Sequence, residues 1–109
     1  MISIIDYGAG NIFSVKNALD YLGLDSILTS DINQIKEADA LILPGVGAFP
    51  GAMKMLDDSG MTDVIKEEAS KKPLLGICLG MQMLFDKSYE FEKTEGLGLI
   101  SGKVDRIEA

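Results

Sequence analysis

The 109-residue sequence predicts one α/β domain with a doubly wound parallel sheet and helices on both of its faces. The first observation behind this prediction is that short apolar runs alternate with segments whose apolar residues recur at helical spacing. The second is that glycine or proline stands at many of the boundaries between these segments. The third is that no internal repeat, linker or low-complexity tract interrupts the alternation, which favours a single domain.

The first half of the chain supplies three predicted strands and two predicted helices. Strands are expected where β-branched and other apolar residues gather, at 1–6, 25–30 and 40–44. Helices are expected between them, at 11–22 and 31–39. The residues of the first helix that we expect to face the sheet are Ile12, Val15, Ala18, Leu19 and Leu22. Gly23 then ends that helix, and Ser30 or Asp31 caps the second one.

The second half is expected to continue the alternation and then to end in an extended segment. Its predicted elements are helices within 47–60, 61–72 and 79–88, a strand at 73–77, and an extended segment at 97–108 with a break at Gly102. Met61, Val64 and Ile65 are expected to face inward in their helix. Lys71 and Lys72 are expected to complement the negative C-terminal end of the same helix.

Three further expectations concern the last third of the chain. The helix at 79–88 is apolar around most of its circumference, which predicts that it is well buried. The charged run at 90–95 is expected to be a solvated loop. Because the chain stops just after a predicted strand, we expect that strand to keep an unpaired edge through which the chain self-associates. This open edge is a first indication that the chain is part of something larger.

The composition argues against two classes of partner. The formal net charge is −7 and the ten Lys and Arg residues are scattered, so the chain lacks the basic face that nucleic acid requires. Its apolar runs are far shorter than the ~20 residues of a membrane-spanning helix, and its N-terminus lacks the pattern of a secretory signal. The single cysteine rules out an internal disulfide and fits a reducing, cytoplasmic location.

The segment GICLGMQ, at 76–82, places the only cysteine of the chain, Cys78, between two glycines at a predicted strand-to-helix turn. A reactive residue on such a turn forms a nucleophile elbow. The positive end of the following helix favours the thiolate, and the backbone N–H groups from Leu79 onward are expected to be free to bind an oxyanion. A lone cysteine is more often a buried structural residue, but the flanking glycines favour a nucleophile. The chain contains no histidine, which is the usual base beside such a cysteine.

Two other glycine-containing segments follow predicted strands. In PGVGAF, at 44–49, glycines free backbone N–H groups to face a ligand, although a plain turn explains the segment equally well. YGAGN, at 7–11, begins like a dinucleotide fingerprint, but Phe13 stands at the third glycine position and the next strand lacks an acidic residue at its end. We therefore expect no nicotinamide cofactor. No other cofactor and no metal site is expected either. Asp6 is either a polar ligand or a brace for its loop.

With IIDYGAGN, LPGVGAF and GICLGMQMLF in this order, the sequence resembles the triad-type (class I) glutamine amidotransferases. Within them it is similar to the glutaminase subunits of imidazole glycerol phosphate synthases, because DYGAGN and PGVGAF distinguish that branch. The resemblance covers the whole chain and implies a flavodoxin-like fold. It also implies hydrolysis of glutamine through a cysteine thioester, with delivery of the ammonia to a cyclase subunit, a (βα)₈ barrel, in histidine biosynthesis.

The resemblance assigns roles to individual residues of this sequence. It implies that Cys78 is the nucleophile and that the backbone N–H groups of Leu79 and Val46 bind the oxyanion. The residues that it places in the substrate pocket are Gly45, Gly47, Gly76 and Gln82. It places Asn11 toward the cyclase interface.

The chain also departs from the family. The family's histidine base and acidic orienter belong to the second half of a chain of roughly 200 residues. Since this sequence has no histidine and its sheet is unfinished, the resemblance implies that residues 1–109 are the N-terminal half of a single glutamine amidotransferase domain and are inactive by themselves. Two alternatives stay open: a non-catalytic module that docks on the cyclase, and a cysteine hydrolase or redox protein of similar fold.

Overall fold

The computed structural model describes residues 1–8, 12–45, 49–88 and 94–104 and confirms the predicted α/β architecture. In this part of the chain, four parallel strands form the main sheet in the order β2-β1-β3-β4. These strands are β1 (Ile2–Ile5), β2 (Ser26–Thr29), β3 (Ala40–Leu43) and β4 (Leu74–Gly76). The order reverses between β1 and β3, which is the place where doubly wound sheets bind their ligands.

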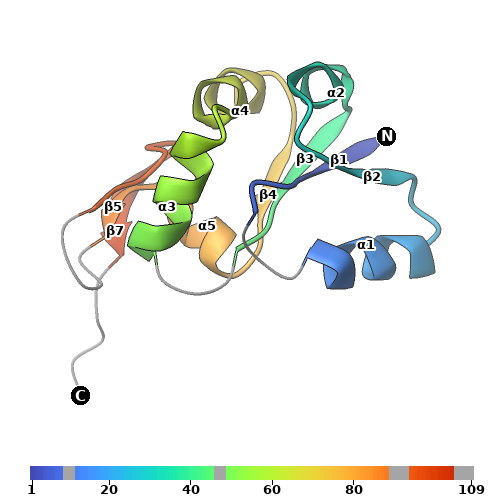
Figure 1. Cartoon of the computed structure of the whole chain (residues 1–109), viewed down its shortest axis with the longest axis horizontal. Coiled ribbons are helices and arrows are strands. Elements are labelled where there is room, and N and C mark those ends of the chain that lie inside the picture. The colour runs from blue at the N-terminus through green and yellow to red at the C-terminus, as the bar shows by residue number, and fades with distance from the viewer. Residues whose placement is uncertain (9–11, 46–48, 89–93, 105–109) are drawn as a thin grey trace.

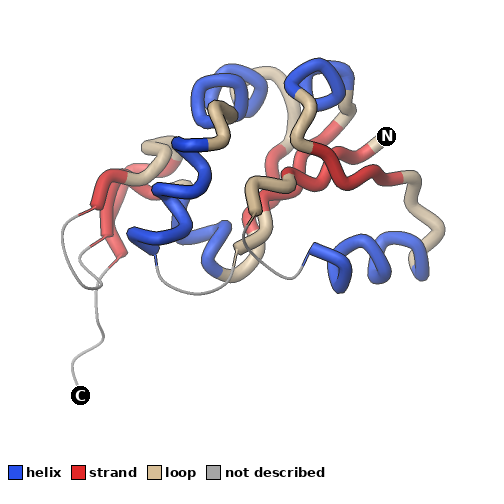
Figure 2. Tube along the Cα trace, in the orientation of Figure 1, coloured by secondary structure: helices blue, strands red, loops and turns tan. Residues whose placement is uncertain are grey.

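Helices cover both faces of the main sheet. Those among the described residues are α1 (Ile12–Tyr21), α2 (Ile32–Glu37), α3 (Phe49–Asp58), α4 (Thr62–Ala69) and α5 (Leu79–Met83). Figure 2 shows α1 on one side of the sheet and α2 and α4 on the other. The cap of α2 is Asp31, whose carboxylate accepts from the Asn33 N–H at 2.8 Å, rather than Ser30. Gly23 ends α1 with a φ of 76°, as its position predicted.

Alternate residues of the strands pack on opposite faces of the main sheet. On one face Ile4 and Ile42 pack with Leu19 of α1. The other face supports the larger core, in which α2 to α5 contribute buried residues: Ile35, Phe49, Ala52, Met53, Leu56, Val64, Ile65, Leu79 and Met83. The prediction that Met61, Val64 and Ile65 face inward is confirmed.

The α1 helix turns less of its surface inward than predicted. Leu19 is buried and Ile12 and Val15 are half-buried, but Ala18 and Leu22 are exposed. The reason for Leu22 is that α1 ends at Tyr21, so Leu22 stands in the turn beyond the helix. The inward stripe is narrow because α1 contacts mainly β1 and β2, at one side of the sheet.

The helix predicted at 79–88 is wrong in its second half. Residues 85–88 form a strand, β5 (Phe85–Ser88), because α5 ends at Met83. This strand pairs antiparallel with β6 (Thr94–Glu95) and parallel with β7 (Ile100–Val104), which gives a second sheet. The solvated loop expected at 90–95 is therefore wrong for residues 94 and 95, while residues 90–93 lie outside the described residues. A short apolar run satisfies helix and strand patterns alike, so its spacing alone did not separate them.

The last strand, β7, is not left without a partner, because it pairs with β5, but at the end of the order β6-β5-β7 it keeps one edge open among the described strands. Gly102 does not divide the segment into two strands. The register moves from Phe85 opposite Ile100 to Lys87 opposite Lys103, so β7 contains one additional residue. Gly102, with a φ of 135°, lies within this bulge. Among the described strands of the main sheet, it is β4 that leaves an edge open beside the second sheet.

At the amino end of the main sheet, Lys72 joins α4 to α2. Its Nζ donates to the carbonyls of Ile35 at 3.0 Å and Lys36 at 2.8 Å, and it pairs with the Glu68 carboxylate at 2.9 Å. The prediction placed Lys71 and Lys72 at the end of α4, and both do pair with Glu68 of that helix, Lys71 at 3.5 Å. Lys72 in addition reaches the C-terminal carbonyls of α2, which the prediction did not include. The hydrogen bond from Lys72 holds the pKa of the buried Glu68 carboxyl below its usual value.

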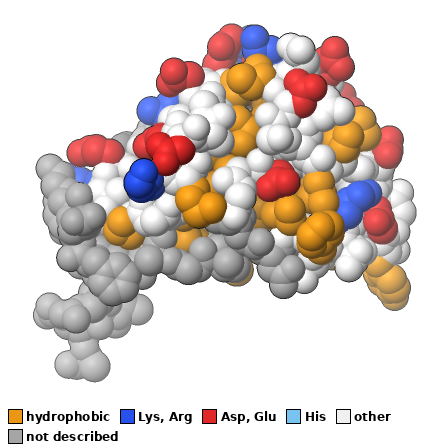
Figure 3. Space-filling view, viewed as in Figure 1, with side chains coloured by type: hydrophobic (Ala, Val, Ile, Leu, Met, Phe, Trp, Pro, Cys, Tyr) orange, Lys and Arg blue, Asp and Glu red, His pale blue; other side chains and the backbone are white. Residues whose placement is uncertain are grey.

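The surface is mixed in charge. Acidic and basic side chains are interspersed on the face shown in Figure 3, without a basic patch. No helix in the described ranges has the length and apolar character needed to cross a membrane. No group of three or more His, Cys, Asp or Glu side chains among the described residues is arranged to hold a metal ion.

Candidate active site

The carboxyl ends of β1, β3 and β4 meet where the strand order reverses. The segments that follow these strands are 6–7, 44–45 and 77–78. They are tied to one another directly, since the Ile77 N–H donates to the Leu43 carbonyl at 3.0 Å and the Tyr7 hydroxyl donates to the Pro44 carbonyl at 2.7 Å. The described residues of the three motifs that the sequence singled out, among them Tyr7, Pro44 and Cys78, therefore converge at one corner of the sheet.

Cys78 occupies the turn between β4 and α5 in a backbone conformation that L-residues rarely adopt. Its φ is 54° and its ψ is −122°, and among the described residues it is the one non-glycine residue with a positive φ. Such strain persists only where the surrounding structure imposes it, and it concentrates at functional turns. The cysteine is exposed, which contradicts the alternative of a buried structural residue. The geometry is that of a nucleophile elbow.

Glycines bring α5 against the ends of β3 and β4. A Cβ atom on Gly80 would lie 1.9 Å from the Leu43 carbonyl oxygen, and one on Gly76 would lie 2.6 Å from the Met81 Cα. A Cβ atom on Gly45 would lie 2.7 Å from the Gly80 nitrogen. Backbone therefore meets backbone at this corner, with no room for a side chain. Gly45 and Gly76, which the resemblance places in the substrate pocket, serve close packing here.

The backbone N–H groups after Cys78 are not free, contrary to the prediction. The Leu79 N–H donates to the Gly45 carbonyl at 3.2 Å. The N–H of Gly80 donates to the Ile77 carbonyl, and that of Met81 donates to the Cys78 carbonyl. The physical reason is that Gly45 packs directly against the start of α5. An oxyanion reaches the Leu79 N–H only if the Gly45 carbonyl moves away.

Tyr7 belongs to this corner, although its sequence context did not single it out. Its side chain is 5% exposed, and its hydroxyl, besides donating to Pro44, lies 3.6 Å from the sulfur of Met83 in α5. Burial raises the pKa of the Tyr7 phenol to about 12, so the group remains a hydrogen-bond donor at neutral pH. The feature of the sequence that could have indicated Tyr7 is its place directly after a predicted buried strand, at the start of a glycine-rich loop.

The structure describes some of the remaining predicted residues. Gln82 lies half-buried in α5, and its N–H donates to the Cys78 carbonyl at 3.4 Å. The Asp6 carboxylate accepts from the Gly8 N–H at 3.2 Å, which supports a role as a brace for its loop. Val46, Gly47 and Asn11 lie outside the described residues.

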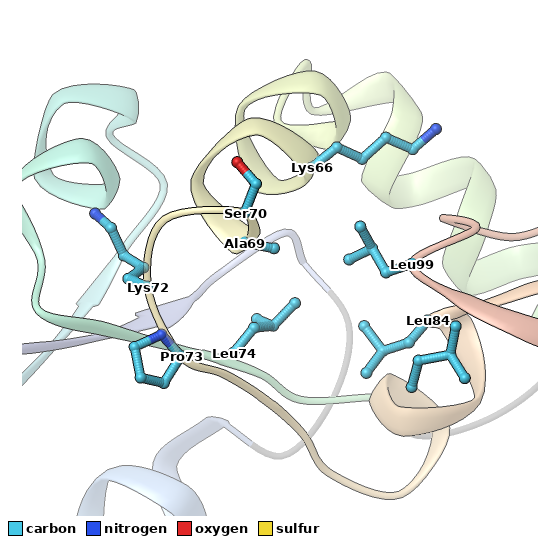
Figure 4. Close-up of a pocket in the computed structure, with 9 residues that line it drawn as sticks. Lys66, Ala69, Ser70, Lys72, Pro73, Leu74, Leu84 and Leu99 are labelled. Carbon is cyan, nitrogen blue, oxygen red and sulfur yellow. The ribbon is translucent and has the colours of Figure 1, made fainter.

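A pocket of about 450 Å³ lies beside the open edge of β4, and Cys78 does not line it. Its lining residues are Lys66, Ala69, Ser70, Lys72, Pro73, Leu74, Leu84, Leu99 and Ile100. Figure 4 shows that Leu74, Leu84 and Leu99 point toward the same space from separate elements, while Lys72 extends toward α2. The pocket is thus an apolar gap between the main sheet and the second sheet.

The family of the chain follows from comparison with known proteins. Residues 2–107 match the family model of the CobB/CobQ-like glutamine amidotransferase domain. The chain belongs to this family. A crystal structure of a glutamine amidotransferase shares the fold, with a TM-score of 0.80 at 22% identity over 96% of this chain and 56% of that one. The resemblance read from the three glycine-containing motifs is therefore confirmed.

Individual members of the family have closely similar sequences. The chain is 58% identical over 105 residues to the imidazole glycerol phosphate synthase subunit HisH of Caldanaerobacter subterraneus, covering 95% of this chain and 52% of that protein. It is 50% identical over 107 residues to the subunit of the same name from Exiguobacterium sibiricum, covering 98% of this chain and 55% of that protein. The chain thus spans about half the length of the curated relatives it matches.

Proposed function

We propose that the chain is the N-terminal half of a glutaminase domain that hydrolyses glutamine and supplies the ammonia to a cyclase in histidine biosynthesis. The observation that carries the proposal is Cys78, exposed and strained on the turn between β4 and α5. The similarity to HisH subunits supports the substrate and the pathway. In this proposal the partner is a (βα)₈-barrel subunit, the two chains form a cytoplasmic heterodimer, and Asn11 lies toward the partner.

The proposed reaction proceeds through a thioester. The Cys78 thiolate attacks the carboxamide carbon of glutamine, which forms a C–S bond and an oxyanion. When the oxyanion collapses, the C–N bond breaks and a general acid protonates the departing ammonia. Water then hydrolyses the thioester to glutamate and the free thiol. We assign the oxyanion to the N–H groups of Leu79 and Val46. The substrate-binding positions in the proposal are Gly45, Gly47, Gly76 and Gln82.

The Leu79 N–H has to be released before it serves as an oxyanion donor. It is bound to the Gly45 carbonyl at 3.2 Å in the described arrangement. A glycine backbone rotates at low cost, so substrate binding or docking of the partner is able to turn this carbonyl away. A donor that becomes available only with the correct substrate links catalysis to specificity.

The proton transfers require residues from outside these 109, because the sequence contains no histidine. The similar HisH subunits are about twice as long, since the chain covers 52% of one of them. We propose that the remaining half docks on β4, one of the two edge strands of the main sheet as the described residues form it. Leu75 on that strand is 57% exposed, and the apolar pocket beside Leu74 opens along the same strand. A strand and helices added there would bury both.

A glutamine-analogue electrophile tests the proposed function. We expect it to label Cys78 in the complete gene product and expect free glutamine to slow the labelling, because both bind the same site. Mass spectrometry of the labelled peptide gives the rate.

The controls are a Cys78→Ser variant and a reagent with the same leaving group but without the glutamine side chain. Free glutamine should have no effect on labelling when the variant replaces the wild-type protein, or when this reagent replaces the glutamine analogue. If peroxide oxidises Cys78 while the glutamine analogue leaves it unmodified, the glutaminase proposal fails and a redox role is favoured. The 109-residue chain assayed alone is expected to release no ammonia from glutamine.

A further inference from the structure

Tyr7 connects three elements at the reversal of strand order. It follows β1, its hydroxyl donates to the Pro44 carbonyl after β3 at 2.7 Å, and that hydroxyl lies 3.6 Å from the sulfur of Met83 in α5. The side chain is only 5% exposed. A buried hydroxyl that loses its acceptor is costly, so this contact resists any rotation of the Pro44 carbonyl.

The Pro44 carbonyl controls the position of Gly45. Leu43 is held in β3, and the proline ring fixes the φ of Pro44, so the ψ of Pro44 is the first free torsion before Gly45. Because the peptide group is planar, the bond from Tyr7 to the Pro44 carbonyl fixes that torsion. The Tyr7 hydroxyl also lies close beside Gly45, because a Cβ atom added to Gly45 would be 3.0 Å from it.

The next carbonyl along the chain is the one that covers the Leu79 N–H. The Gly45 oxygen accepts from Leu79 at 3.2 Å. We propose that Tyr7 is a positioning residue: by holding the Pro44 carbonyl, its hydroxyl fixes the nitrogen and Cα of Gly45 and thereby favours the Gly45 carbonyl on the Leu79 N–H, while the φ and ψ of Gly45 itself still allow a substrate oxygen to displace that carbonyl. The consequence for catalysis rests on the proposed glutaminase function, in which Leu79 is an oxyanion donor. The positioning itself does not depend on that function.

Amide hydrogen exchange in the complete gene product measures the positioning directly. We expect Tyr7→Phe to raise the exchange rate of the Leu79 amide about fivefold, as loss of one typical hydrogen bond implies. The Ile77 amide, which donates to the Leu43 carbonyl at 3.0 Å in the same corner, should be unchanged. Tyr21→Phe is the matched control, because it removes the same hydroxyl from a side chain that is 92% exposed.

A second variant separates the hydrogen bond from packing. Met83→Leu removes the sulfur beside Tyr7 and leaves the bond to Pro44 in place, so the exchange of Leu79 should stay at the wild-type rate. The proposal is overturned if Tyr7→Phe leaves the Leu79 rate unchanged, if it accelerates Ile77 equally, or if Met83→Leu has the same selective effect.

Kinetics then distinguish this proposal from the proposed function. In the complete enzyme with its partner, Tyr7→Phe is expected to raise kcat for glutamine hydrolysis about fivefold with KM unchanged, because an oxyanion donor acts in the transition state. Faster exchange at Leu79 with an unchanged kcat would support the positioning by Tyr7. The same result would refute the assignment of Leu79 as an oxyanion donor, and thus that part of the proposed function.

Discussion

The two ends of the main sheet are held together by different means. At the carboxyl end, Gly76 and Gly80 let backbone touch backbone, with no space for a Cβ atom. At the amino end, the long side chain of Lys72 spans from α4 to the last carbonyls of α2. The carboxyl end, which carries Cys78, is therefore specified by shape, whereas the amino end is specified by charge and hydrogen bonding.

This difference explains where the strain of the molecule is located. The conformation of Cys78 is unfavourable for an L-residue and needs surroundings that leave it no alternative. Contacts between backbone atoms meet that need, because they do not yield as a flexible lysine does. The corner formed by β3, β4 and α5 is thus the natural place for a side chain that has to be held in a strained position.

The largest effect is expected from adding a methyl group to a glycine at the carboxyl end of the main sheet. We expect Gly80→Ala to destabilise the protein by more than about 3 kcal/mol, since the added carbon would lie 1.9 Å from the Leu43 carbonyl oxygen. Urea unfolding of the complete gene product measures the free energy of unfolding.

Gly51→Ala is the matched control for this change. Gly51 lies in α3 with nothing within 4 Å of an added Cβ atom, so alanine should stabilise the helix by up to about 1 kcal/mol. Equal stability of the two variants would show that the close approach of α5 to β3 does not specify this end of the sheet.

The next largest effect is expected at the amino end. Lys72→Met should cost about 2 kcal/mol, because it removes a charged donor from the carbonyls of Ile35 and Lys36. The side chain of Lys71 is 59% exposed, so Lys71→Met should cost less than about 0.5 kcal/mol. Thermal unfolding of the two variants compares them, and a loss as large for Lys71→Met would show that general charge, not the bridge between helices, stabilises this end.

The sequence predicted much of the carboxyl end because its determinants are local. The apolar run ALIL predicts a buried strand, and the following Pro44 predicts where that strand ends. The glycines around Cys78 likewise indicate a strand-to-helix turn. The hydrogen bond from Leu79 to Gly45 was beyond such reasoning. It joins segments more than thirty residues apart through a backbone N–H and a backbone carbonyl. Nearly every residue type has these groups, so the sequence does not indicate which ones pair.

The second sheet was missed for a related reason. Residues 84–85 continue the apolar pattern of α5, so their spacing agrees with a longer helix as well as with a strand. The strand forms because β7, more than ten residues later, offers its edge to Phe85 and Lys87. Lys72 shows the same limit: its sequence position indicated the end of α4, whereas the tertiary fold brought the end of α2 within its reach.

The smallest expected effect has the opposite sign and concerns Cys78 itself. Glycine adopts a φ near 54° without the steric cost that any Cβ atom imposes. We therefore expect Cys78→Gly to be more stable than Cys78→Ala by about 1 kcal/mol, after the entropy of the more flexible unfolded chain is taken into account. Both variants lack the thiol, so the comparison isolates the backbone strain, and urea unfolding measures the difference.

The sign of this difference decides how the two ends of the sheet relate to function. If Cys78→Gly is the more stable variant, the corner stabilises a conformation that costs stability, as expected where a side chain is held for chemistry rather than for packing. Equal stability, or a more stable alanine variant, would mean that the turn holds Cys78 without strain. The close contacts of Gly76 and Gly80 would then serve the fold alone, and the carboxyl end would differ from the amino end only in how it is joined.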